Sequence, residues 1–99
     1  METKSINQKA VATFVAKNLN LPVELIYKKA KFGNVPFARQ ITFYVLRIMG
    51  VTNREIAKEF KMSDSTVTTT YNRGITLFNK NENFTKIAKA IINEFETTD

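Results

Sequence analysis

Apolar residues recur every three or four positions along almost the whole chain, and this spacing is the strongest constraint on its fold. Such a rhythm is typical of amphipathic helices, which have 3.6 residues per turn, whereas strands alternate apolar and polar residues. Only three glycines and two prolines interrupt the 99 residues. The sequence therefore predicts an all-α fold, a compact bundle of about six helices in one domain over residues 1–99.

Capping signals place two helices in the first quarter of the chain. Ser5 and Gln8 predict a capping box for a first helix over residues 7–18. Pro22 lies in the first turn of a short second helix that starts within residues 21–24, where its missing N–H is not needed. The residues expected to face the core are Ala10, Val11, Phe14, Val15, Leu25 and Ile26.

A third helix is nearly apolar on all sides, which predicts a central position in the bundle. Pro36 opens it and it runs to Met49, before a glycine at the usual C-terminal position, Gly50. A last helix is expected from about Phe84 to Phe95, after a polar turn over residues 79–83. The residues expected to be buried are Phe37, Ile41, Tyr44, Val45, Ile48, Phe84, Ile87, Ala88, Ile91 and Phe95.

Residues 52–67 have the pattern of a helix-turn-helix. Thr52 and Glu55 predict a capping box for a helix that ends near Phe60, and Ser63 or Asp64 caps the next helix, over about 63–78. A small residue is expected where the two helices cross most closely, and a turn of a few residues sets them at a steep angle. The residues expected to form the apolar contacts are Ile56, Ala57, Phe60, Met62, Val67, Tyr71, Ile75 and Phe78.

The charge distribution favours a polyanionic partner. Fifteen Lys and Arg against nine Asp and Glu give a net charge of +6, and no acidic residue occurs between positions 25 and 54. The chain has no histidine and no cysteine, which removes the usual zinc ligands and the commonest general base. We expect no cofactor, no bound metal and no enzymatic activity. No apolar run approaches the roughly 20 residues that span a bilayer, so we expect a cytoplasmic protein.

The start of the second helix of this motif is unusually rich in hydroxyl side chains. Threonine is a poor residue for a helix interior, because its branched side chain loses rotamer freedom. Its hydroxyl can reach phosphates and base edges, and its methyl group can touch thymine. The pattern favours a recognition helix in the major groove. The alternative is a structural turn between helices with a solvated threonine face. The polar residues in question are Ser63, Asp64, Ser65, Thr66, Thr68, Thr69 and Thr70.

With these motifs in view, the chain resembles the C-terminal DNA-binding domain, domain IV, of the bacterial replication initiator DnaA, a Trp-repressor-like helix-turn-helix. The resemblance rests on residues 39–41, on Glu55, Ile56 and Phe60, and on the stretch 64–67, and it extends upstream over the first two helices and the basic loop 28–34.

The resemblance implies a division of labour on double-stranded DNA. Lys31 takes the position of the loop cation that enters the minor groove, and Arg39 and Gln40 that of the pair that contacts DNA. Arg47 takes the position of a phosphate contact. Lys28 to Lys31 could instead be a solvated loop, Arg39 could cap or pair within the fold, and Arg73 could be a phosphate contact or a surface residue. The full set of expected DNA-contacting residues is Lys29, Lys31, Arg39, Gln40, Arg47, Arg54, Ser63, Asp64, Ser65, Thr66, Thr68, Thr69 and Arg73.

The chain also departs from the pattern it resembles. The family's recognition helix begins Asp-His-Thr-Thr, and either residues 64–67 or residues 63–66 match it here, in both cases without the histidine. The phosphate-binding loop of the initiator's ATPase is absent. We therefore expect a monomeric, stand-alone DNA reader that acts in replication or transcription. The alternative is a module that binds and regulates a replication or transcription protein, with the helix-turn-helix as its scaffold.

Overall fold

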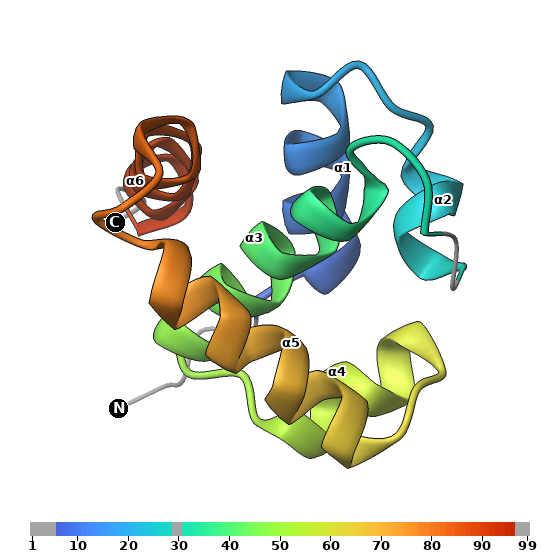
Figure 1. The fold of residues 1–99 in the computed structure, drawn as a ribbon. Coiled ribbons are helices and arrows are strands. Elements are labelled where there is room, and N and C mark those ends of the chain that lie inside the picture. The colour runs from blue at the N-terminus through green and yellow to red at the C-terminus, as the bar shows by residue number, and fades with distance from the viewer. Residues whose placement is uncertain (1–5, 29–30, 97–99) are drawn as a thin grey trace.

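The computed structural model describes residues 6–28 and 31–96, and within them it contains six helices and no strand. Figure 1 shows five helices grouped around α3, which confirms the expected all-α bundle. Ser5, which was expected to cap the first helix, lies outside the described residues. The helices are α1 Gln8–Asn18, α2 Val23–Tyr27, α3 Val35–Ile48, α4 Asn53–Phe60, α5 Asp64–Leu77 and α6 Glu82–Glu96.

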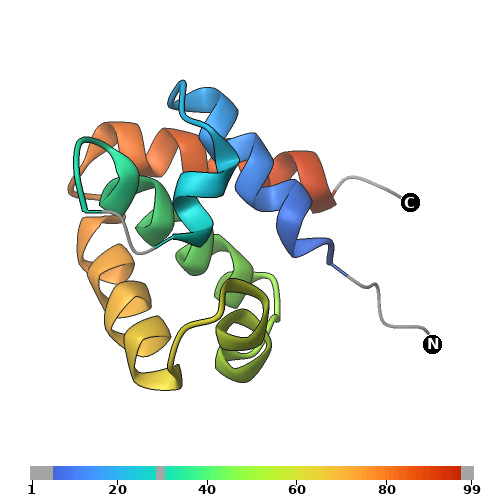
Figure 2. The same ribbon diagram turned by 90° about the vertical axis from the view of Figure 1, so that its right-hand side faces the viewer.

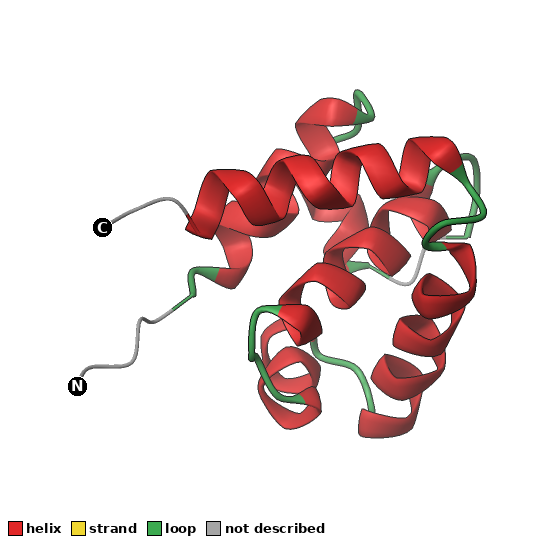
Figure 3. Ribbon diagram, turned by 90° about the vertical axis from the view of Figure 1, so that its left-hand side faces the viewer, coloured by secondary structure: helices red, strands yellow, loops and turns green. Residues whose placement is uncertain are grey.

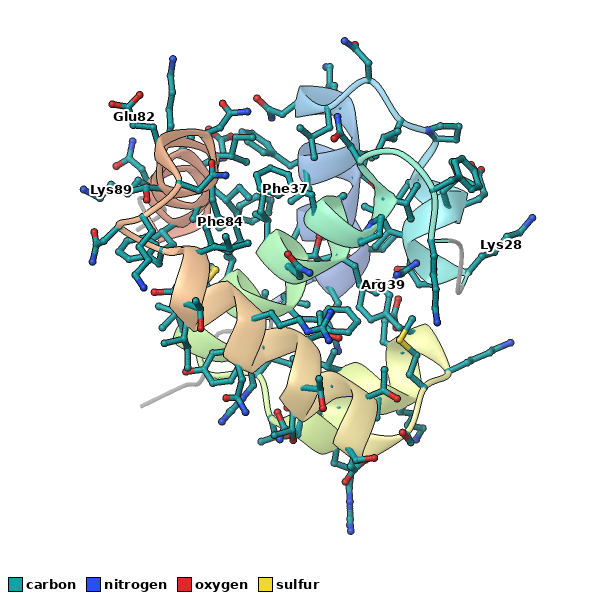
Figure 4. All side chains as sticks on the ribbon, viewed as in Figure 1. Lys28, Phe37, Arg39, Glu82, Phe84 and Lys89 are labelled. Atoms are coloured by element: carbon teal, nitrogen blue, oxygen red, sulfur yellow. The ribbon has the colours of Figure 1, made fainter. Side chains whose placement is uncertain are left out.

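The central helix is α3, as its composition predicts. Nine of its 14 residues are buried, and it contacts each of the other five helices. α6 lies on the opposite side of α3 from α4 (Figures 1 and 3). Phe37 of α3 and Phe84 of α6 face each other between these helices (Figure 4), with ring centroids 5.8 Å apart in an edge-to-face arrangement. α3 is therefore the rigid element on which the rest of the domain is built.

The first and last helices begin at residues other than those expected, and α3, expected over residues 36–49, is shifted by one residue to Val35–Ile48. The N-cap of α1 is Asn7, whose side chain accepts a hydrogen bond from the Ala10 N–H at 3.0 Å. The last helix starts at Glu82, two residues before the expected Phe84, because the Asn81 side chain accepts the Phe84 N–H at 3.0 Å and so acts as a cap. The polar turn expected over residues 79–83 is correspondingly shorter.

Two apolar residues that were expected in the core are exposed. Ile48, at the last turn of α3, is 47% exposed, and Ile75 of α5 is 49% exposed. In α5 the buried position is taken by Gly74, which follows Val67 by seven residues and so lies on the same face of the helix. A Cβ atom on Gly74 would lie 2.9 Å from the Tyr44 Cβ, so α5 packs against α3 at this glycine.

The buried stripe of α1 is also displaced slightly from the expected one. Val11 and Val15 are buried as expected, but Ala10 and Phe14 are only partly buried and Leu25 of α2 is likewise partly buried. The remaining core positions of α1 are filled by the small side chains Ala12 and Ala16, which allow close packing against α3.

Candidate nucleic-acid interface

The helix-turn-helix consists of α4 and α5, joined by a three-residue turn at a steep angle (Figure 2). The capping box that opens α4 is present as predicted: the Thr52 side chain accepts the Glu55 N–H at 3.2 Å, and the Glu55 carboxylate accepts the Thr52 N–H at 2.9 Å. The bonds that the Glu55 carboxylate accepts, from the Thr52 N–H and from the Thr52 hydroxyl at 3.1 Å, lower the pKa of the Glu55 carboxyl group. Ile56, Ala57 and Phe60 are buried against the core.

Lys61 ends α4 in a left-handed conformation, with φ 55° and ψ 53°. This conformation is the one that glycine adopts without strain, and glycine is common at such turns. The lysine side chain itself is exposed. The turn of the helix-turn-helix therefore has the left-handed conformation common at helix ends, although Lys61 adopts it less readily than glycine would.

Ser63 is the N-cap of α5, which decides between the two caps that the sequence allowed. Its side chain accepts the Thr66 N–H at 3.1 Å, and its hydroxyl donates to the Thr66 Oγ1 at 2.9 Å. Asp64 is consequently the first residue of α5. Ser65 and Thr66 occupy the next two positions, so both lie in the first turn, where the positive end of the helix dipole favours an anion.

A groove runs between the start of α3, the loop before it and the outer face of α5. Residues far apart in the sequence line it together, and no acidic side chain is among them. Most of its α5 members were expected as DNA contacts, but Pro36 and Met62 were not. Thr70 was expected only as part of the hydroxyl-rich start of the recognition helix and was not in the final set of contacts. The lining residues are Lys31, Pro36, Arg39, Gln40, Met62, Ser65, Thr66, Thr69, Thr70 and Arg73.

Arg39 is the buried cation of this groove. Its side chain is only 7% exposed, and its guanidinium donates hydrogen bonds to the carbonyls of Ile26 and Leu25, both at 3.2 Å, and to that of Lys28. These carbonyls belong to the last turn and the C-cap of α2, where helical partners run out; that of Leu25 also accepts the Lys28 N–H at 3.3 Å. Burial lowers the pKa of the Arg39 guanidinium. The side chain thus caps α2 within the fold, the second of the two roles considered for it.

Not every residue expected to contact DNA lies in the groove. Lys29 lies outside the described residues. Thr68 lies on the side of α5 that faces α4, where its hydroxyl accepts a hydrogen bond from the Asn53 side chain at 2.8 Å. Arg54 is exposed on α4 and is not a lining residue. Figure 4 shows Lys28 pointing away from the domain, whereas Arg39 lies near its centre.

Arg47 lies at the opposite end of α3 from the loop. Its guanidinium carbon is 5.0 Å from the centre of the Tyr71 ring, a distance at which the cation is attracted by the ring face. Among the described residues its Nε has no hydrogen-bond partner. Tyr71 is in turn stacked with Tyr44, with ring centroids 6.0 Å apart. Arg47 is therefore held against α5 outside the groove.

The described part of the chain contains no group of acidic, histidine or cysteine side chains that could hold a metal ion. None of the described helices has the length and apolar character that crossing a membrane requires.

Comparisons with known proteins agree with the motif. No curated protein matches the chain. A family model, described as the helix-turn-helix of the bacterial dnaA protein, matches residues 8–73. The match covers α1 to α4 and the part of α5 that lines the groove, and it ends before the last turn of α5 and α6. The chain belongs to the family of the bacterial DnaA helix-turn-helix.

Proposed function

We propose that this domain binds double-stranded DNA with the start of α5 in the major groove and the loop 28–34 at the adjacent minor groove. One observation carries the proposal: Lys31 of the loop and the hydroxyl side chains of α5 line the same groove, with no acidic residue among its walls. A helix in the major groove with a cation placed beside it can contact bases and backbone at once. The membership of the DnaA helix-turn-helix family supports the same partner.

Phosphate contacts are assigned to the exposed cations of the groove. Lys31 and Arg73 both line it and are exposed. Arg39 stays in the fold as the cap of α2, and Gln40 beside it faces the groove. The proposed outer contacts beyond the groove are Arg47, Arg54, Ser63, Asp64 and Thr68, and a contact is proposed for Lys29 as well.

We propose further that the domain prefers thymine-containing sites. No arginine, lysine, asparagine or glutamine precedes Asn72 in α5, so the first two turns lack the side chains that bind guanine or adenine through two hydrogen bonds. Ser65, Thr66 and Thr69 offer hydroxyl and methyl groups instead. Methyl groups recognise the thymine methyl through apolar contact.

The proposed biological role is the regulation of replication or transcription by a monomeric reader that needs no metal or cofactor. What supports a role in replication or transcription is that the chain belongs to the family of the bacterial DnaA helix-turn-helix.

Selection from a pool of random duplexes tests the preference. We expect an enriched motif, and we expect weaker binding when a critical thymine is replaced by deoxyuridine, which lacks only the methyl group. One buried methyl contributes about 0.8 kcal/mol, or roughly fourfold in Kd.

Matched substitutions assign the contact to a residue. Thr69→Val keeps the methyl and should keep the preference for thymine over deoxyuridine, whereas Thr69→Ser keeps the hydroxyl and should lose it. Thr76→Ser, on α5 but outside the groove, is the control and should behave as the unmodified protein does. An unenriched pool would contradict sequence preference, and no binding at low salt would contradict DNA binding and favour a protein partner.

A further inference from the structure

Phe32 differs from the other seven phenylalanines of the chain. Its side chain is 62% exposed, whereas the others are buried in the core or packed against it. A phenylalanine normally contributes to folding by burying its large apolar surface. A single exposed apolar residue is common on protein surfaces. Whether Phe32 has a role in binding therefore depends on where it lies. The other seven are Phe14, Phe37, Phe43, Phe60, Phe78, Phe84 and Phe95.

The backbone holds Phe32 at the entrance to α3. Its carbonyl accepts a hydrogen bond from the Val35 N–H at 3.2 Å, and Val35, the first residue of α3, is fully buried. Between them Gly33 has a φ of +56°, a conformation that favours glycine. Phe32 thus belongs to a tight turn that is anchored to the core at Val35, and the turn leaves the ring in solvent.

The surroundings of Phe32 favour a polyanion over an apolar protein surface. Lys31, its neighbour, lines the proposed DNA groove, and Lys28 is exposed at the start of the same loop. No acidic residue occurs between positions 25 and 54. An exposed aromatic ring next to a lysine matches a ligand that presents both phosphates and base faces.

We propose that Phe32 inserts between bases at the minor groove next to Lys31 and acts as an apolar wedge. The proposal rests on the proposed binding of duplex DNA and adds a contact to it. Inserted phenylalanine side chains partly unstack a base step and bend the duplex toward the major groove. In this arrangement Lys31 contributes the attraction for phosphate, and Phe32 contributes stacking, which does not depend on salt.

The chain contains no tryptophan, so Phe32→Trp introduces a single reporter at the loop. The probe is an A·T-rich duplex of about 20 base pairs, or two helical turns. We expect the tryptophan fluorescence to be quenched when the duplex saturates the protein, because the indole stacks on bases. The control is Lys89→Trp, since Lys89 is exposed on α6, away from the groove (Figure 4), and its fluorescence should not change.

Affinity for the same duplex, fluorescein-labelled and followed by anisotropy, provides the second readout. Phe32→Ala should raise Kd about 5- to 150-fold, the range for stacking on one base, and should leave the salt dependence unchanged. Its thermal unfolding should match that of the unmodified protein, because the side chain it loses is exposed.

The outcomes separate the two proposals. If the unmodified protein fails to bind the duplex at low salt, both are overturned. If it binds, but Phe32→Ala binds equally well, the wedge alone is overturned. Loss of affinity in Phe32→Ala without quenching in Phe32→Trp would also contradict insertion between bases.

Discussion

The guanidinium of Arg39, in the first turns of α3, donates a hydrogen bond to the main-chain carbonyl of Lys28, the residue that ends α2. Together with its bonds to the carbonyls of Leu25 and Ile26, this contact ties the beginning of α3 to the end of α2. The loop that carries Lys31 starts at this junction. Arg39, which lines the groove, thus holds the start of the loop that carries Lys31, the cation proposed for the minor groove.

Replacing Arg39 tests whether its role is structural. Arg39→Ala should lower the free energy of unfolding by about 2–3 kcal/mol, because it leaves buried carbonyls without charged donors. Arg39→Lys should lose most of the same stability, since an ammonium group cannot reproduce the fork of donors. Urea denaturation followed by circular dichroism measures both. Unchanged stability together with lost DNA binding would instead identify Arg39 as a direct contact.

Gly74→Ala should destabilise the domain. The new Cβ would lie 2.9 Å from the Tyr44 Cβ and 3.2 Å from the Gln40 carbonyl oxygen, and neither is the movable end of a side chain. We expect a loss of about 1–3 kcal/mol from this overpacking, which outweighs the roughly 1 kcal/mol by which alanine favours a helix. The exposed Thr76→Ala is the control and should change stability by less than about 0.5 kcal/mol. A stabilised Gly74→Ala variant would contradict the close packing of α3 and α5.

Lys61→Gly should stabilise the domain. The left-handed conformation costs a residue with a side chain about 1–2 kcal/mol, and the greater freedom of glycine in the unfolded chain offsets part of this. We expect the free energy of unfolding to rise by about 0.5–1 kcal/mol, which would be measured as a higher urea midpoint with an unchanged m value. A loss of stability would show that the turn does not require this conformation.

Tyr27 should make stability depend on pH in the alkaline range. Its hydroxyl donates to the Glu59 carboxylate at 2.6 Å, and burial together with this carboxylate raises the pKa of Tyr27. In the unfolded chain the Tyr27 hydroxyl has its ordinary pKa of 10.0. In the folded protein the hydroxyl is still protonated at that pH. The contribution of Tyr27 to the free energy of unfolding is therefore complete below about pH 10, and it falls as the pH rises further.

The control for this prediction is Tyr27→Phe, which cannot ionise. Its stability should fall less steeply above about pH 10 than that of the unmodified protein. Equal slopes for the two proteins in urea titrations at several alkaline pH values would contradict the raised pKa.

Features set by neighbouring residues were predictable from the sequence. The capping box of Thr52 and Glu55 depends on side chains three positions apart, and the central place of α3 follows from its apolar composition. Ile75 was wrongly expected in the core because periodicity favours the larger apolar residue, while packing against α3 requires Gly74 at the contact. The start of α6 was misplaced because Asn81 was taken as a turn residue and not as a cap.

The candidate site was only partly predictable for a different reason. The hydroxyl residues of α5 follow from composition, but the groove depends on how α5, α3 and the loop are placed relative to one another. The sequence does not reveal that Thr68 faces Asn53. It also leaves open whether Arg39 faces solvent or the carbonyls of α2, because an arginine serves equally well in either place.

The salt dependence of duplex binding tests the central claim most directly. Each phosphate that the protein neutralises contributes a slope of about −0.9 to log K against log salt, so the slope should correspond to several phosphates. Lys31→Ala and Arg73→Ala should each reduce its magnitude by about 1. Lys89→Ala, on α6 and away from the groove (Figure 4), should leave it unchanged. Equal slopes in all four proteins, or a duplex affinity that does not respond to salt, would contradict DNA binding by this groove.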